Sequence, residues 1–329
     1  METFRLHFLV HMPRAGSTLL ARELDRCEDV GVGIEESLPD GIVWGEPVQI
    51  KTRQNLDHYL NKAYRDEKIR KWAIDKGRLR GKLLADHAFP LDIRDVLMAL
   101  HSLYFGEDVP GCVIHKKGPY YRHIERVRKL FPGSGIILID RDPRAIYNSQ
   151  KQALRSNSGK PMAESLSTFA FQYIESQQVI KRYVPEGLFC LVRYEDLLND
   201  PSGVINRLLD FLGVAAEDAA DGTYESKIPS SQQHLHRNLG SGMMKERIDA
   251  WREELRTDEI YFLQNVLKRT LRGNGYGIRP VRWREVTDKP AVAGQLAYFY
   301  LKYSIKRLAP GFYLFMKRLL KKPSGTYHE

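Results

Sequence analysis

Two stretches of this sequence place cations and hydroxyl groups where they could bind an anion. The first is residues 13–18, Pro-Arg-Ala-Gly-Ser-Thr, which follow an apolar stretch at residues 4–12 and precede an apolar-periodic one. A turn of small residues that opens a helix presents backbone N–H groups and the positive end of the helix dipole to an anion. Arg14 adds a permanent cation, and Ser17 and Thr18 add hydroxyl donors. The pattern predicts a loop that binds a phosphate-sized anion.

The second stretch begins where another apolar segment ends. Residues 135–140, GIILID, predict a buried strand, and Arg141-Asp142-Pro143-Arg144 follows directly. An aspartate before a proline suits a helix N-cap with proline at the first helical position, so we expect a helix over residues 145–154. Arg141 then stands at a strand end, and Ser149 lies eight residues further on. Each alone is as typical of a surface arginine or an ordinary helical serine as of a ligand.

The elements around these stretches alternate in type. A strand at residues 4–12 and one at 135–140 are each followed by a helix, and a helix at 121–131 precedes the second. Further along, the patterns predict a helix at 163–184, a strand at 188–192, a helix from Asp200 towards Phe211, a polar, glycine-rich loop at 215–244, and helices at 249–255 and 257–271. This alternation predicts an α/β fold with a central, mainly parallel sheet and helices on both faces.

Bulk composition narrows the class of protein. The 329 residues are 43% hydrophobic, enough for a large globular core, and 51 Lys and Arg against 41 Asp and Glu give a net charge of +10. Such a charge favours polyanionic partners, among them nucleotides, acidic glycans and anionic membranes. Cys27, Cys112 and Cys190 lack the paired spacing of a zinc site or disulfide framework. With no long apolar stretch either, we expect a cytoplasmic protein, soluble or peripheral on a membrane.

Together the two motifs resemble the family of sulfotransferases that use 3′-phosphoadenosine 5′-phosphosulfate (PAPS), closest to its carbohydrate-type and bacterial members. The loop Pro13–Thr18 is similar to the family's 5′-phosphosulfate loop. The segment RDPRAIYNS is similar to its 3′-phosphate motif, in which an arginine at a strand end and a serine eight residues later bind that phosphate. The resemblance covers residues 5–260 and implies a three-layer, P-loop-like fold.

The resemblance also implies a set of donor ligands. Tyr194 enters through VRYEDLLNDP, which is similar to the family's tyrosine-glutamate-aspartate segment. Two departures stand out: Ala15 occupies a position where serine is frequent, and no arginine directly follows Met243 in the loop HRNLGSGMM. The residues expected to bind PAPS, or its product adenosine 3′,5′-bisphosphate, are Arg14, Ala15, Gly16, Ser17, Thr18, Leu19, Arg141, Ser149 and Tyr194.

For the chemistry, carbohydrate-type members carry a glutamate followed by proline after the loop helix, and Glu46-Pro47 is the match here. We expect Glu46 to take the proton from the acceptor hydroxyl as its oxygen attacks sulfur in line, with Arg14 and Lys117 stabilising charge on the leaving phosphate. His115 is the rival base. The leaving phosphate is already acidic, so no metal is expected, unlike in phosphoryl transfer.

The last part of the chain differs in kind. Residues 291–322 carry seven Lys or Arg, no acid, and many aromatics. We therefore divide the chain into a sulfotransferase domain, 1–280, and a basic extension, 281–329. This extension is predicted to form amphipathic helices that either pack on the domain or bind an anionic membrane surface. The resemblance to carbohydrate-type members implies a saccharide as the hydroxyl acceptor, and a membrane-bound extension would make it a lipid-linked saccharide.

Three other functions stay open at this point. A P-loop kinase would need Gly-Lys-Ser/Thr, whereas here Gly16 is followed directly by Ser17 and the cation precedes the glycine. A non-catalytic relative that binds nucleotides or glycans would fit the lack of an arginine after Met243. Nucleic-acid binding is not expected, because the basic residues are dispersed outside the tail and no recognised motif is present.

Overall fold

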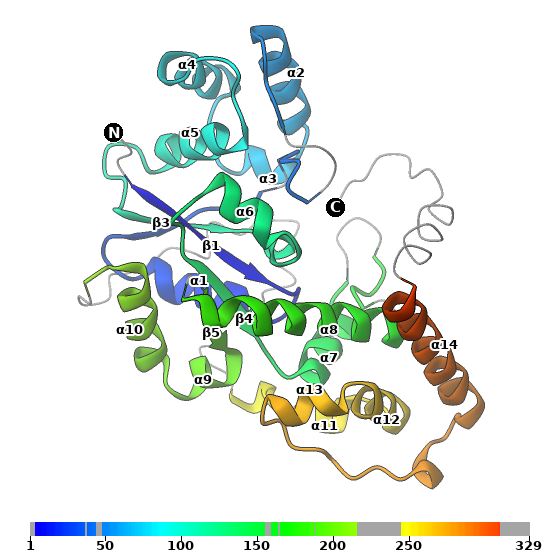
Figure 1. Ribbon diagram of the computed structural model, residues 1–329. Coiled ribbons are helices and arrows are strands. Elements are labelled where there is room, and N and C mark those ends of the chain that lie inside the picture. Colours follow the sequence, from blue (N-terminus) through cyan, green and yellow to red (C-terminus); the bar gives the residue numbers. More distant parts are fainter. Residues whose placement is uncertain are drawn as a thin grey trace. The chain divides into compact units, whose positions relative to one another are not determined.

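The computed structural model describes residues 4–36, 38–43, 48–154, 159–163, 165–187, 189–215 and 245–309. The chain forms two compact units, and each is described by itself. The first comprises Met1–Arg141 and Gln178–Lys245. The second comprises Asp142–Gln177 and Glu246–Glu329. Figure 1 shows the elements and their labels. The predicted division into 1–280 and 281–329 stays a prediction.

A five-stranded parallel sheet forms the centre of the first unit. Its strands follow the order β2-β3-β1-β4-β5, so β1 is central and β2 and β5 lie at the edges. In the register, Phe8 of β1 pairs with His115 of β3 and with Ile136 of β4. The strands are β1 (Arg5–His11), β2 (Val30–Val32), β3 (Cys112–Lys116), β4 (Ile136–Asp140) and β5 (Phe189–Arg193).

The sequences of the inner strands explain their place. In β1, β3 and β4 nearly every residue is buried, as a parallel sheet covered on both faces requires. The β4 sequence, Ile-Ile-Leu-Ile-Asp, is apolar up to its last residue. Charged side chains therefore gather where the strands end, at the carboxyl edge of the sheet, where ligands bind in open α/β folds.

Helices cover both faces of this sheet (Figure 1). The connection from β1 to β2 moves along the sheet in one direction, and those from β2 to β3 and from β3 to β4 move in the other. Because such crossovers are right-handed, α1 lies on one face, and α2–α5 and α6 lie on the opposite face. The helices are α1 (Ser17–Asp25), α2 (Arg53–Ala63), α3 (Glu67–Arg70), α4 (Lys76–Asp86), α5 (Ile93–Phe105), α6 (Ile124–Leu130), α9 (Tyr194–Asn199) and α10 (Pro201–Leu212).

The second unit is helical and is held by one buried arginine and an aromatic core. Arg144 is 1% exposed, pairs with Asp142 at 2.6 Å, donates to Gln264 and to the Gly277 carbonyl, and lies 3.9 Å from the Trp251 ring. The rings of Phe171, Phe262 and Tyr303 surround Phe299. Its helices are α7 (Pro143–Gln152), α11 (Trp251–Glu254), α12 (Thr257–Val266), α13 (Lys268–Gly273) and α14 (Lys289–Leu308), and α8 (Leu166–Tyr183) continues from it into the first unit.

Most predicted elements are confirmed, with shifted ends. The helix predicted at 121–131 is shorter, because residues 118–122 form a 3-10 turn before α6. The single helix predicted at 257–271 is broken at Leu267 into α12 and α13. The predicted loop at 215–244 and the tail beyond residue 309 lie outside the described residues, apart from residue 215. The edge strand β2 and the helices α2–α5 were not predicted from the sequence.

Substituting the buried Arg144 should destabilise the protein more than substituting an exposed arginine. We expect Arg144→Ala to lower the free energy of unfolding by about 3 to 5 kcal/mol, because Asp142 is left buried without its partner. Arg182 and Glu125 form an ion pair with side chains 68% and 61% exposed, so Arg182→Ala should cost less than about 1 kcal/mol. Urea denaturation measures both values, and equal losses would contradict this account of Arg144.

Candidate functional site

The loop between β1 and α1 has the geometry of an anion site. Gly16 caps α1 with φ 103°, and Arg14 also adopts a left-handed conformation, φ 71°. Strained backbone of this kind persists where surrounding structure enforces it, often at ligand sites. Ser17 and Thr18 begin α1, and their side chains are almost fully buried. The first N–H groups of a helix point out of its N-terminus, which here adjoins the loop. Ala15, within the loop, is completely buried.

Two other strand ends meet this loop. Arg141 follows β4, and Tyr194 follows β5 as the first residue of α9. The Arg141 guanidinium lies 4.2 Å from the centre of the Tyr194 ring and donates to the Arg14 carbonyl at 3.5 Å. A Cβ on Gly16 would overlap Cδ2 of Tyr194. The fold therefore brings together Arg14, Gly16, Arg141 and Tyr194, which were predicted to bind one ligand.

A lysine joins the loop from the strand on the other side. Lys116 ends β3, its side chain is 5% exposed, and its Nζ donates to Thr18 Oγ1 at 3.0 Å. The same Nζ lies 3.5 Å from Glu35 Oε2, and Lys68 Nζ of α3 lies 3.3 Å from Glu35 Oε1. Lys116, Glu35 and Lys68 thus form a charged chain that runs from the loop between β1 and α1, through the partly exposed Glu35 carboxylate, to α3.

Burial and charge set the pKa values in this chain. Burial lowers the pKa of Lys116 although Glu35 opposes that effect. Burial alone would raise the pKa of Glu35, but Lys68 and Lys116 hold it well below its usual range. Burial and the nearby Lys116 lower the pKa of His11, at the end of β1, to about 4, so its ring is neutral at pH 7. The charged chain is therefore one carboxylate between two lysines, beside a neutral imidazole.

A second acidic residue behaves differently. The Glu36 side chain is fully buried and accepts from Lys117 Nζ at 2.9 Å and from the Leu38 N–H, while His115 Nε2 lies 3.2 Å away. Burial would raise the pKa of Glu36, but Lys117 and these hydrogen-bond partners lower it to about 2. A carboxylate so enclosed anchors the segment after β2 and cannot reach a substrate.

Among the described residues, the structure does not bring the predicted catalytic side chains together at the loop. Lys117 Nζ is tied to the Glu36 carboxylate and carbonyl, while Lys116 is the lysine that contacts the loop. His115 is fully buried behind Glu36. Glu46 lies outside the described residues. The roles given to Glu46 and Lys117 stay predictions from the sequence.

Ser149 and Leu19 complete the predicted donor ligands. Leu19 lies in the first turn of α1 and is buried. Ser149 lies in α7, which belongs to the second unit, and is partly exposed. Its pairing with Arg141 on one phosphate stays a prediction from their spacing. Among the residues that the structure describes, no group of three or more His, Cys, Asp and Glu side chains could hold a metal ion.

Sequence reasoning missed Glu35, Lys68 and Lys116. The signal for Glu35 was a pair of adjacent acids after the apolar run Val30-Gly31-Val32, but a three-residue strand is too short to stand out as one. Lys116 looked equivalent to its neighbour Lys117, and only the strand alternation separates them. Lys68 lies on a four-residue helix that no pattern marks.

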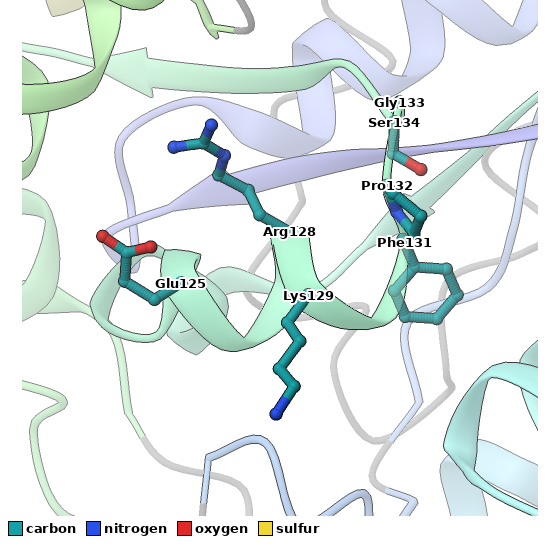
Figure 2. A pocket seen from close by; sticks show the side chains of 7 residues that line it. All are labelled: Glu125, Arg128, Lys129, Phe131, Pro132, Gly133 and Ser134. Atoms are coloured by element: carbon teal, nitrogen blue, oxygen red, sulfur yellow. The ribbon is translucent and has the colours of Figure 1, made fainter.

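A pocket of about 400 Å³ lies away from this site (Figure 2). It is formed where α6 leads into β4, so it lies at the amino edge of the sheet, opposite the phosphate loop. Its lining residues are Glu125, Arg128, Lys129, Phe131, Pro132, Gly133 and Ser134.

A parallel sheet with an anion loop after its central strand defines a P-loop-like nucleotide-binding fold. The model of a family described as "Sulfotransferase family" matches residues 8–218, about two thirds of the chain. The chain therefore belongs to the sulfotransferase family. As a member it is an enzyme that transfers a sulfuryl group from PAPS and releases adenosine 3′,5′-bisphosphate.

Solved structures support the fold. The sulfotransferase domain from the curacin biosynthetic pathway is 19% identical, covers 85% of this chain and 100% of its own, and has a TM-score of 0.57. The sulfotransferase domain from the Synechococcus PCC 7002 olefin synthase is also 19% identical, covers 85% of this chain and 98% of its own, and has a TM-score of 0.50. A search among curated proteins found no match.

The close contact between Gly16 and Tyr194 yields a testable prediction. Gly16→Ala should lose most of the rise in melting temperature that adenosine 3′,5′-bisphosphate gives the wild type, because the new methyl group displaces the Tyr194 ring and the loop around it. Gly133→Ala is the matched control: Gly133 also has positive φ, 84°, but no atom lies within 4 Å of the position that its new methyl group would take. A differential scanning fluorimetry series in which Gly16→Ala keeps the full ligand-induced rise would contradict this placement of the donor.

Proposed function

We propose that this protein transfers the sulfuryl group of PAPS to a hydroxyl group of a saccharide or lipid-linked saccharide, with a glutamate as general base. The acceptor oxygen forms a bond to sulfur while the bond from sulfur to the 5′-phosphate oxygen breaks. The electron pair of the broken bond stays on the phosphate, and the hydroxyl proton moves to the glutamate. Adenosine 3′,5′-bisphosphate leaves, and no metal takes part.

One observation carries the proposed chemistry: Lys116 contacts both the phosphate loop and Glu35. Its Nζ is 3.0 Å from Thr18 Oγ1 and 3.5 Å from Glu35 Oε2. A cation at this point can neutralise charge on a phosphosulfate held by the loop. A carboxylate 3.5 Å from that cation is a candidate to take the proton of an incoming hydroxyl.

We assign the base role to Glu35. Its side chain is 25% exposed and so can meet a substrate, whereas Glu36 and His115 are fully enclosed. In the free protein the two lysines keep the pKa of Glu35 low, which makes it a weak base. A bound donor adds negative charge beside Lys116, which offsets the effect of that cation on Glu35 and so raises the pKa of the carboxyl group. Donor binding would thereby activate the base, and Glu46 remains the alternative from the sequence.

Two arginines fit the leaving group. Arg14 lies in the loop itself, and Arg141 is held against the loop by the Tyr194 ring and the Arg14 carbonyl. Guanidinium groups bind phosphate oxygens with paired, charge-assisted hydrogen bonds. We therefore place the 5′-phosphate at the loop and give Arg141 the 3′-phosphate, in line with the motif that contains it.

The acceptor class rests on the sequence. The resemblance to carbohydrate-type members, in Glu46-Pro47 and in the glycine-rich segment near Met243, favours a saccharide over a phenol. The net charge of +10 favours acceptors that carry acidic groups. A lipid-linked saccharide would fit the carbohydrate-type motifs and the positive charge, and it would also fit a basic tail that binds a membrane.

The assignment of the base can be tested by substituting the two glutamates. With radiolabelled PAPS, a panel of saccharides and a chelator present, Glu35→Gln should lower kcat for sulfuryl transfer by about 100- to 10,000-fold, because proton removal is lost. The KM for PAPS should change much less. Glu46→Gln, the matched control, should change kcat by less than about threefold.

The reverse pattern would move the base to Glu46 and end the case for Glu35. Transfer to no acceptor, with PAPS bound, would favour a non-catalytic relative. Transfer of phosphate from ATP, dependent on magnesium, would favour a kinase.

A further inference from the structure

Helix α14 of the second unit has apolar residues on two opposite faces. Val292, Leu296, Phe299 and Tyr303 recur at helical spacing on one side. Val292 and Phe299 are buried, and the Phe299 ring lies 4.6 Å from that of Phe171. This side packs on the unit and accounts for one apolar stripe.

The opposite side of α14 carries a second stripe that faces outward. It consists of Tyr298, Leu301, Ile305 and Leu308, again at spacings of three and four residues. Tyr298 is 55% exposed, Leu301 63% and Leu308 82%. Soluble helices that pack on a core normally place polar residues on this side. We call these four residues the outer stripe.

The charged side chains that α14 itself contributes are all positive. Helix α14 contains Lys289, Lys302, Lys306 and Arg307 and no acidic residue. Lys306 is held by Glu175 at 2.5 Å, and the Lys302 ammonium lies 5.6 Å from the centre of the Tyr298 ring. The sequence continues without an acid to residue 322 and adds Lys317, Arg318, Lys321 and Lys322.

We propose that the outer stripe of α14 docks the protein on an anionic lipid bilayer. An apolar stripe with an aromatic residue and flanking cations is the composition of helices that lie in a membrane interface. The cations complement the negative charge of anionic headgroups. In the part of the chain that the structure describes, no helix is long and apolar enough to cross a membrane, so α14 would lie on the surface.

A second copy of the chain is the other occupant to weigh. Packing two outer stripes against each other would bring Lys302 and Arg307 of one helix close to the same cations of the other. Such like-charge contacts oppose association, whereas an anionic surface removes the repulsion. The charge pattern therefore favours lipid, and this inference does not depend on the proposed acceptor or general base.

Vesicle flotation of the full-length protein tests the inference. We expect wild type to bind vesicles of phosphatidylcholine that contain phosphatidylglycerol, and to bind vesicles of phosphatidylcholine alone at least about tenfold more weakly. The double variant Leu301→Ser, Leu308→Ser should lower binding to the anionic vesicles by about tenfold or more, because two exposed leucines no longer enter the interface. Leu154→Ser is the matched control: Leu154 is 47% exposed in the same unit but lies off α14, so binding should stay within about twofold.

Several results would overturn the inference. One is wild type that does not float with anionic vesicles. Another is a double variant that binds them as wild type does, since binding would then not use the outer stripe. A third comes from sedimentation velocity without lipid: a wild-type dimer that the double variant converts to monomer would assign the stripe to a second copy of the chain.

Discussion

The candidate site of this protein depends on charged side chains that are held at the ends of buried parallel strands. Lys116 is the last residue of β3 and is almost fully buried, so its ammonium must find oxygen partners within the fold. It finds the Thr18 hydroxyl on one side and the Glu35 carboxylate on the other. Because of these two partners, the phosphate loop and the segment after β2 occupy fixed positions relative to each other.

The remaining strand ends complete the same edge. Tyr194 after β5 fills the space beside Gly16, which only a glycine leaves open, and stacks with Arg141 after β4. Behind the edge, Lys117, Glu36 and His115 form a second, enclosed set of polar side chains, in which Lys117 holds both Glu36 and Asp40. The partly exposed set can act on substrates, and the enclosed set is suited only to positioning. Side chains alternate between the two faces at the end of β3, so Lys116 faces the loop while His115 and Lys117 face Glu36.

Much of this arrangement could be predicted from the sequence, and the residues that were missed were missed for physical reasons. The loop at 13–18 and the Arg141 segment were recognisable because a strand, a small-residue turn and a helix leave local signals. Tyr194 was found through its motif, although its packing on Gly16 is a contact between distant segments. Glu35 and Lys116 were missed because their roles arise from three strands meeting, which no local pattern records. The two faces of α14 were visible only once one of them was seen to be buried.

Calorimetric titration of adenosine 3′,5′-bisphosphate into the protein, with a chelator present, tests whether the donor binds at this edge of the sheet. We expect a Kd in the micromolar range or tighter without metal, and a loss of affinity of about 100-fold or more in Arg141→Ala, because charge-assisted phosphate contacts are lost. Absence of binding to wild type, or equal affinity in wild type and Arg141→Ala, would contradict the placement of the donor at this edge of the sheet.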